Sequence, residues 1–248
     1  MSAALIVLAA LGAWEAIVRA GLVDELILPA PTQVAEALWT DRDLLAPDLA
    51  VTTWEVVLGL AAAIAAGTAL GIAMHVSPAA ARALRPLVIG SQAVPVPVIA
   101  PLVVLVLGFG LAPKVLLVAL VCFFPVAINL YDGLRDTDPD ARKLLRSLDA
   151  SRWQTLRMLE LPSALPSAFT GVKVAAAVAV IGAVFAEWSG SDSGLGHALL
   201  TANGQLATAR AFAATLLLFL LAVCLYGAFA LLERRVAGWT PRSRTGGP

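Results

Sequence analysis

Six runs of about 20 mainly apolar residues divide this chain, and each is long enough to cross a bilayer as a helix. They lie near residues 2–19, 52–74, 84–107, 113–131, 167–188 and 210–232. The runs are continuous and rich in Ala, Leu and Val, without the alternation typical of membrane strands. Because 60% of the 248 residues are hydrophobic and only 14% are charged, a soluble fold is excluded. We expect an all-α, polytopic membrane protein with about six transmembrane helices, forming a single domain over residues 1–248.

Positive charge is distributed unevenly along the chain, although the formal net charge is zero. If the N-terminus lies inside, 13 of the 17 Lys and Arg residues fall in inner loops, at inner span ends or in the tail. The four outside are Arg19, Arg42, Lys114 and Arg210. Since cytoplasmic loops carry the excess of Lys and Arg, we expect both termini in the cytoplasm of a bacterium, with residues 240–248 as a flexible tail. The first run has no basic start and no clear cleavage site, so we do not expect it to be removed as a signal peptide.

Four prolines interrupt the third run: Pro86, Pro95, Pro97 and Pro101. Each interior proline removes a backbone donor and pushes the residue before it toward extended geometry. Broken backbone at membrane depth is tolerated where protein buries it or where it lines a wet cavity. The candidate residues of a translocation pathway at this break are therefore Ser91, Gln92, Pro95 and Pro97. The alternative is a kinked helix packed on its neighbours.

A few polar side chains lie within the runs. Glu187, at the outer end of the fifth run, is expected to face the bundle interior or water and is a pathway candidate. Asn129, in the fourth run, is another, and its alternative role is a hydrogen bond between helices. Glu55 lies near an outer span end and is expected to reach water. His75 and His197 are isolated near opposite membrane faces, so no metal site is expected.

Two runs carry small residues at four-residue intervals. They are Gly59, Ala63, Gly67 and Gly71 in the second run, and Gly171, Ala175, Ala179 and Ala183 in the fifth. Small faces let helix backbones approach closely in lipid. They predict either packing within the chain or, for one of the two runs, a subunit interface.

A charged loop, residues 138–162, separates the fourth and fifth runs. Asp138 followed by Pro139 predicts a helix start, because Asp caps free N–H groups and Pro fits the first helical position. A helix of about ten residues should follow, with cations in its later turns, where they suit the dipole. Its basic and apolar positions include Lys143, Leu144, Leu145, Arg146 and Leu148.

Residues 149–150 break this pattern, and a capping box beginning at Ser151 predicts a second short helix. It should run from Arg152 to Pro162, with Pro166 preventing a smooth continuation into the fifth run. The two helices would be basic on one side and apolar on the other. This shape favours docking to another protein, and the alternative is a helix pair lying on anionic lipid.

The stretch RSLDASRWQTLRMLELPSALPSAFTGVK resembles the EAA loop of permease subunits of ATP-binding cassette (ABC) importers. Lys143, Leu144 and Leu145 occupy the EAA positions, and Leu161-Pro162 retains the final LP. Asp149 stands where the family has a glycine. This departure bears on the docking geometry, because glycine adopts a left-handed turn more readily than Asp.

The resemblance covers nearly the whole chain and includes LPAPTQV, the stretch beginning SQAVPVPVIAP, and GAVFAEWSGSDSGLGHALL. These stretches are similar to the importer branch that serves nitrate, sulfonate, taurine and thiamine-pyrimidine precursors. The resemblance implies a type I (MetI-like) importer permease that passes a small nutrient, with hydroxymethylpyrimidine or a riboflavin-like heteroaromatic as the leading cargo. Aliphatic sulfonate, taurine or nitrate is the alternative cargo. A proton-coupled secondary transporter that uses Glu187 is the alternative of another class.

The same resemblance implies the partners: cytoplasmic ABC ATPase subunits, an external substrate-binding protein and a second, identical permease copy, besides membrane lipids and without nucleic acid. No GxxxxGK[ST] loop occurs, so the chain is not expected to be an enzyme or to hold a cofactor; ATP and Mg²⁺ would bind the partner ATPase. The residues expected to contact the ATPase are Lys143, Leu144, Leu145, Arg146, Leu148, Asp149, Ala150, Ser151, Arg152, Trp153 and Pro162.

Overall fold

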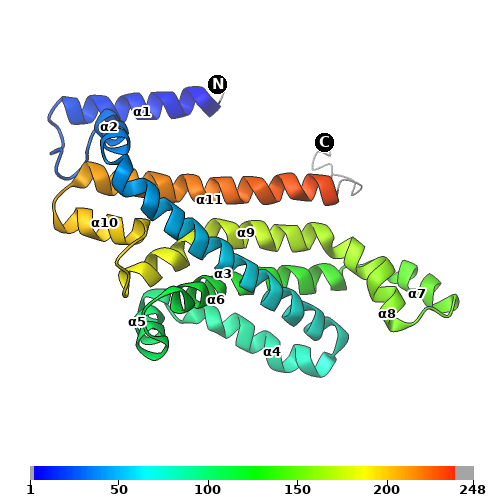
Figure 1. The fold of residues 1–248 in the computed structure, drawn as a ribbon. Coiled ribbons are helices and arrows are strands. Elements are labelled where there is room, and N and C mark those ends of the chain that lie inside the picture. Colours follow the sequence, from blue (N-terminus) through cyan, green and yellow to red (C-terminus); the bar gives the residue numbers. More distant parts are fainter. Residues whose placement is uncertain (1–2, 238–248) are drawn as a thin grey trace.

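The protein is built from helices joined by short connections, as seen in a computed structural model that describes residues 3–237 (Figure 1). No strand occurs in this part of the chain, which confirms the all-α expectation. The elements are α1 (Ala3–Arg19), α2 (Pro31–Thr40), α3 (Arg42–Val76), α4 (Pro78–Gly90), the 3₁₀ turn η1 (Ser91–Ala93), α5 (Val96–Leu107), α6 (Leu111–Arg135), α7 (Pro139–Ser147), α8 (Arg152–Thr155), the π-helical η2 (Leu156–Glu160), α9 (Leu161–Trp188), α10 (Leu195–Gly204) and α11 (Thr208–Val236).

In the described part of the chain, four helices are long and apolar enough to cross a membrane: α3, α6, the continuous helix 152–188 and α11. The α4–α5 pair would make a fifth span, bent by 101° at the break between its helices. The first predicted span corresponds to α1, whose 17 residues extend about 25 Å, slightly less than the hydrocarbon core. The predicted tail, residues 240–248, lies outside the described residues.

α6 lies at the centre of the bundle, between α3 and α9. The small faces of α3 and α9 both pack against it. A side chain at Gly67 would meet the Phe123 carbonyl oxygen and the Val126 side chain, each 2.8 Å from its Cβ, and one at Gly171 would meet the Pro125 carbonyl oxygen. Both small faces therefore serve packing within the chain, the first of the two alternatives that the sequence left open.

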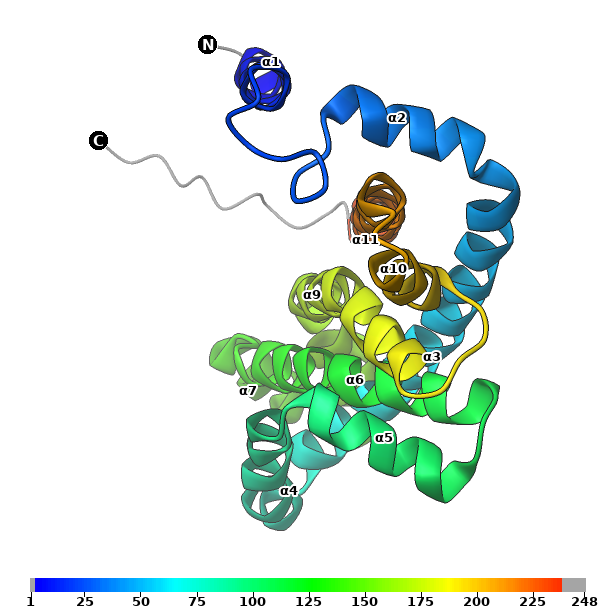
Figure 2. The ribbon, with the colours of Figure 1, turned by 90° about the vertical axis from the view of Figure 1, so that its left-hand side faces the viewer.

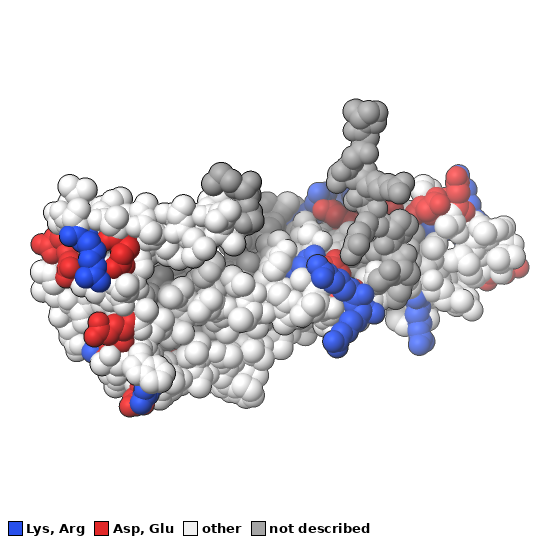
Figure 3. All heavy atoms as spheres, turned by 90° about the horizontal axis from the view of Figure 1, so that it is seen from above, with Lys and Arg blue, Asp and Glu red and all other residues white. Residues whose placement is uncertain are grey.

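The long helices give the molecule two distinct ends (Figure 1). The connection through α7 and α8 projects at one, here called the α7–α8 end; α2, α10 and the α10–α11 turn lie at the other, the α10 end. The first residues of α1 and the last of α11 both point toward the α7–α8 end (Figure 1). Viewed end-on, α1 runs beside the bundle and is connected to it through α2 (Figure 2). On the face in Figure 3, charged side chains gather toward the two ends, with an uncharged band between them.

The backbone break predicted in the third run lies between η1 and α5. Val94 and Pro95 are extended, with ψ angles of 121° and 128°. Val96 and Ala100 also precede prolines, but both are helical, so the expectation of extended geometry fails there. Pro97 is tolerated because it lies in the first turn of α5, where the missing N–H would have no helical partner.

Candidate functional site

The α7–α8 loop is held by the caps that its sequence predicts. The Asp138 side chain accepts a hydrogen bond from the Asp140 N–H, and Ser151 and Gln154 form the capping box of α8. Between the two helices, Asp149 adopts a left-handed conformation with φ = +54°. The Ala150 N–H donates to the Leu145 carbonyl, 3.0 Å away, which closes a Schellman turn. Asp149 therefore provides the turn that glycine gives in the family pattern.

The second helix of the loop does not end at Pro162. It passes through the π-helical turn of η2, where the Leu161 N–H bonds to the Leu156 carbonyl, and continues as α9 to Trp188. The expected separation at Pro166 is therefore wrong. The wider π turn comes just before Pro162 and accommodates its ring without ending the helix. The loop and the span that follows it are consequently one helix.

The loop presents apolar and basic side chains on its surface. Trp153 is 65% exposed and Leu148 69% exposed, with Leu144 and Met158 similarly open. Arg146 and Arg152 are exposed and have no ion-pair partner among residues 3–237. The structure brings several of the predicted docking residues together around a cavity of about 690 Å³: Arg146, Ala150, Arg152 and Trp153.

An ionic cluster attaches this loop to the ends of α3 and α6. Arg142 Nε lies 2.6 Å from Glu160 Oε1, and a terminal nitrogen of the same guanidinium donates to the Leu134 carbonyl. His75 Nε2 lies 2.7 Å from the other oxygen of Glu160. His75 is therefore not isolated, contrary to expectation. Glu160 is buried, so α7 and the end of α3 are fixed to the base of α9.

The residues at the backbone break line a second, smaller cavity. Ser91, Gln92 and Pro95 face a space of about 320 Å³ bounded on the other side by Leu117, Leu120 and Val121 of α6. Pro97 is exposed and does not line it. The break thus brings together three of the six predicted pathway residues.

The other two polar candidates lie elsewhere in the bundle. Asn129 donates to the Pro125 carbonyl one turn earlier in α6, so this hydrogen bond lies within one helix and not between helices. Glu187 is 1% exposed and accepts bonds from the Thr52 hydroxyl and from the N–H groups of Gly196 and His197. Its carboxylate thus binds the start of α10 and joins that helix to α3 and α9.

A buried ion pair beside Glu187 was missed by sequence reasoning. Lys114 Nζ of α6 lies 2.6 Å from Glu55 Oε1 of α3 and 2.6 Å from the Ser191 hydroxyl. Glu55 is only 2% exposed, so the expectation that it reaches water is wrong. The pair joins residues 59 positions apart, so no local sequence pattern predicts it. The short distance between the two charges offsets part of their desolvation, while the second carboxylate oxygen of Glu55 is buried without a hydrogen-bond partner among the described residues.

Comparison with known families decides the class of the protein. Residues 57–238 match the family model described as "Binding-protein-dependent transport system inner membrane component". The chain belongs to this family of ABC importer permeases. It is accordingly a multi-pass inner-membrane permease subunit that is not itself catalytic, and its family implies a separate ATPase and a substrate-binding protein as partners.

Several named relatives resemble this permease over much of their length. It is 34% identical to the formylaminopyrimidine transport permease of Halalkalibacterium halodurans, over 86% of each chain. It is 39% identical to the riboflavin transport system permease of Chloroflexus aurantiacus, over 64% of this chain and 59% of that one. It is 32% identical to the taurine transport permease of Escherichia coli, over 91% and 85%.

The fold of the permease agrees with a solved structure of the same class. The crystal structure of an amino acid ABC transporter with histidines superposes with a TM-score of 0.66, covering 80% of this chain and 96% of that one at 14% identity. At this identity the likeness concerns the fold alone. Together with the family match it confirms the MetI-like expectation. No group of three or more potential metal ligands occurs within residues 3–237 of the permease.

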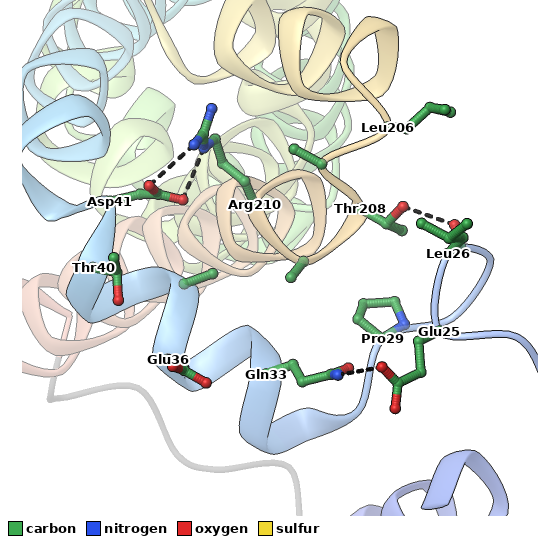
Figure 4. A pocket seen from close by; sticks show the side chains of 13 residues that line it. Glu25, Leu26, Pro29, Gln33, Glu36, Thr40, Asp41, Leu206, Thr208 and Arg210 are labelled. Atoms are coloured by element: carbon green, nitrogen blue, oxygen red, sulfur yellow. Dashed lines mark hydrogen bonds and ion pairs between the residues drawn. The ribbon is translucent and has the colours of Figure 1, made fainter. Parts of the chain in front are cut away.

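At the α10 end, the permease has an open pocket of about 440 Å³ between α2 and the α10–α11 turn (Figure 4). Arg210 and Asp41 form a two-bond ion pair on one side, and Thr208 donates to the Leu26 carbonyl on the other. Glu25 and Glu36 add acidic groups to its lining. These contacts tie the α1–α2 connection to the start of α11.

Proposed function

We propose that the α7–α8 loop is the part of the permease that an ATPase grips and moves. The observation that carries this is the exposed surface of the loop, where Trp153 lines the same cavity as Arg146 and Arg152, and where Leu148 at the end of α7 is exposed as well. Aromatic, aliphatic and arginine side chains are what protein interfaces use at their centres. Capped helices and the left-handed turn at Asp149 hold this face in one conformation, as a docking surface requires.

Continuity of the helix from Arg152 to Trp188 provides the mechanical link. A displacement of the loop passes directly into α9, because no non-helical segment separates them. The Glu160 cluster then carries the same displacement to α3 and α6 through His75 and Arg142. On this proposal, ATP-driven closure of the partner rotates three spans together and no chemistry occurs in the permease.

The proposed orientation places the α7–α8 end and both termini in the cytoplasm. Both described chain ends point that way (Figure 1), and the predicted inner loops carry most of the Lys and Arg. The α10 end then faces outward, where exposed Leu26, Ile27 and Leu206 offer a surface to the substrate-binding protein. In this proposal a second, identical permease copy completes the translocation pathway. The cavity lined by Ser91, Gln92 and Pro95 is part of that pathway.

A cysteine scan tests this pathway. In a variant with Cys122 and Cys224 replaced by serine, Ser91→Cys and Gln92→Cys should react with a membrane-impermeant thiol reagent during turnover. Cys224→Ser alone controls for the exposed native thiol, and a cysteine at lipid-facing Leu220, which is 45% exposed, should stay unreactive. Equal reaction rates at residues 91 and 220 would contradict the assignment.

The cargo proposed is a small heteroaromatic nutrient of the formylaminopyrimidine or hydroxymethylpyrimidine class. The support is the higher identity to the two permeases named for heteroaromatic cargoes than to the taurine permease. The test is reconstitution of the permease with its ATPase and binding protein in proteoliposomes, followed by uptake of labelled pyrimidine, riboflavin and taurine. ATP-dependent uptake of taurine alone would overturn the cargo assignment, and uptake without the ATPase would overturn the coupling.

A further inference from the structure

A pocket of about 480 Å³ at the α7–α8 end collects positive charge, part of which neither the fold nor the coupling proposal uses. Its lining comes from the last turn of α3, the first turns of α4, the end of α6 and α7. Figure 1 shows where these helices lie in the fold. The residues that matter for its chemistry are His75, Arg82, Tyr131, Arg135 and Arg142. We call it the Arg82–Arg135 pocket.

Two of the cations that line this pocket form no ion pair in the described part of the chain, although Asp132 and Asp136 border a neighbouring cavity together with Arg135. Arg142 is neutralised by Glu160, which His75 also contacts. Arg82 and Arg135, in contrast, form no ion pair within residues 3–237. The acids nearest to Arg135 in the chain, Asp132 and Asp136, do not pair with it either.

The arginines are also gathered rather than dispersed. The guanidinium of Arg135 lies 5.6 Å from the centre of the Tyr131 ring, and that of Arg85 lies 5.8 Å from the same ring. Tyr131 is buried, so its packing fixes the position of the ring that both cations approach. Like charges brought to one aromatic ring repel each other, and a bound anion would relieve that repulsion.

The surroundings indicate which anion fits. Arg82, Arg85 and Ile89 are spaced three and four residues apart, so they share one face of α4. Ile89 is 51% exposed. A ligand on this face would therefore meet guanidinium groups at one end and the apolar side chain of Ile89 further along the span.

We propose that the Arg82–Arg135 pocket binds the phosphate of an acidic phospholipid headgroup, with its acyl chains along α4. Guanidinium groups recognise phosphate through paired hydrogen bonds, and basic pockets between spanning helices are suited to anionic headgroups. Because Arg142 and His75 belong both to this pocket and to the Glu160 cluster, a bound lipid would stabilise the base of the α7–α8 loop. This inference concerns a site separate from the exposed docking face.

The test uses the purified full-length permease in neutral detergent, titrated with phosphatidylglycerol or phosphatidylcholine of identical acyl chains and observed by native mass spectrometry. Wild type should prefer phosphatidylglycerol. Arg82→Gln with Arg135→Gln should weaken that binding about 25-fold, at about fivefold for each arginine. The matched control, Arg234→Gln with Arg235→Gln, removes two exposed charges from the end of α11 and should change binding less than about twofold.

Equal phosphatidylglycerol binding by wild type and the Arg82/Arg135 variant would overturn the proposal, as would an equal loss in the control. Displacement of the lipid by millimolar inorganic phosphate would assign the pocket to free phosphate instead. If the Arg82/Arg135 variant bound the ATPase more weakly but bound lipid as wild type does, the pocket would be a contact with the ATPase instead. Arg82→Lys with Arg135→Lys keeps both charges and serves as a second variant in case the Gln variant misfolds. It should retain the preference for phosphatidylglycerol. Loss of that preference in the Lys variant would also count against the site. The lipid titration itself needs neither ATPase nor cargo, so its result is independent of the coupling proposal.

Discussion

Arg142 of α7 holds Glu160 at the base of α9 through a 2.6 Å contact, and Glu160 is shared with His75 of α3. One buried carboxylate thus joins three helices at the point where force would enter the bundle. The consequences of this arrangement can be measured separately for stability and for coupling.

Arg142→Gln should lower the free energy of unfolding by about 1–3 kcal/mol, because Glu160 and the Leu134 carbonyl lose their donor in a buried setting. Uptake in proteoliposomes should fall more than ATP hydrolysis does. Lys143→Gln is the matched control, since its only ion pair within residues 3–237 is with exposed Asp140, and it should change stability by less than about 0.5 kcal/mol. Equal effects of the two substitutions would show that the cluster does not fix the loop.

Charge reversal at Arg146 and Arg152 separates docking from folding. Both side chains are exposed and unpaired in the described part of the chain, so Arg146→Glu with Arg152→Glu should change the free energy of unfolding by less than about 1 kcal/mol. ATP-dependent uptake should fall about tenfold or more, because like charges at an interface strongly oppose association. Pull-down of the ATPase checks the cause. Arg234→Glu with Arg235→Glu is the control, and normal uptake in the loop variant would refute the docking role.

Two substitutions distinguish a capping role of Glu187 from a role in transport. If it caps α10, Glu187→Gln should cost only about 1 kcal/mol, because an amide oxygen can still accept from Gly196 and His197. Glu187→Ala leaves those N–H groups buried without an acceptor and should cost about 2–4 kcal/mol. Thermal unfolding in detergent measures both. A stable Glu187→Gln protein with no uptake would instead make the carboxylate a transport group.

Features that depend on neighbouring residues were predictable from the sequence, whereas pairings between distant helices were not. The cap at Asp138 and the box at Ser151 are local, and so was the break at Pro95. His75–Glu160 and Lys114–Glu55 join residues 85 and 59 positions apart, which no periodicity reveals. The small faces showed that close packing occurs but not against which helix.

Proline was the least reliable guide to helix ends. Pro162 and Pro166 both lie within the helix that ends at Trp188. Local propensity disfavours them, but the π turn before Pro162 and the packing of α9 on α6 outweigh that preference. The predicted separation between the loop and the fifth span failed for this reason.

The turn at Asp149 predicts an unusual response to glycine. Asp149→Gly should stabilise the loop or leave it unchanged, because glycine adopts φ = +54° without the cost that a side chain incurs. Asp149→Val should cost about 1–2 kcal/mol, since β-branched residues tolerate that conformation poorly. Uptake and ATPase binding should follow the same order. Loss of uptake in Asp149→Gly would mean that the carboxylate itself contacts the partner.

Close approach of α3 to α6 can be tested with a single methyl group. Gly67→Ala places a Cβ 2.8 Å from the Phe123 carbonyl oxygen, so the helices must separate, and the free energy of unfolding should fall by about 1–3 kcal/mol. Gly227→Ala is the matched control, because nothing lies within 4 Å of a side chain there. It should be neutral or stabilise α11 by up to about 1 kcal/mol. If Gly227→Ala destabilises the assembled transporter but not the isolated permease, a partner helix packs on the face of α11 that contains Gly227. If Gly67→Ala leaves the free energy of unfolding unchanged, the α3–α6 contact is looser than described.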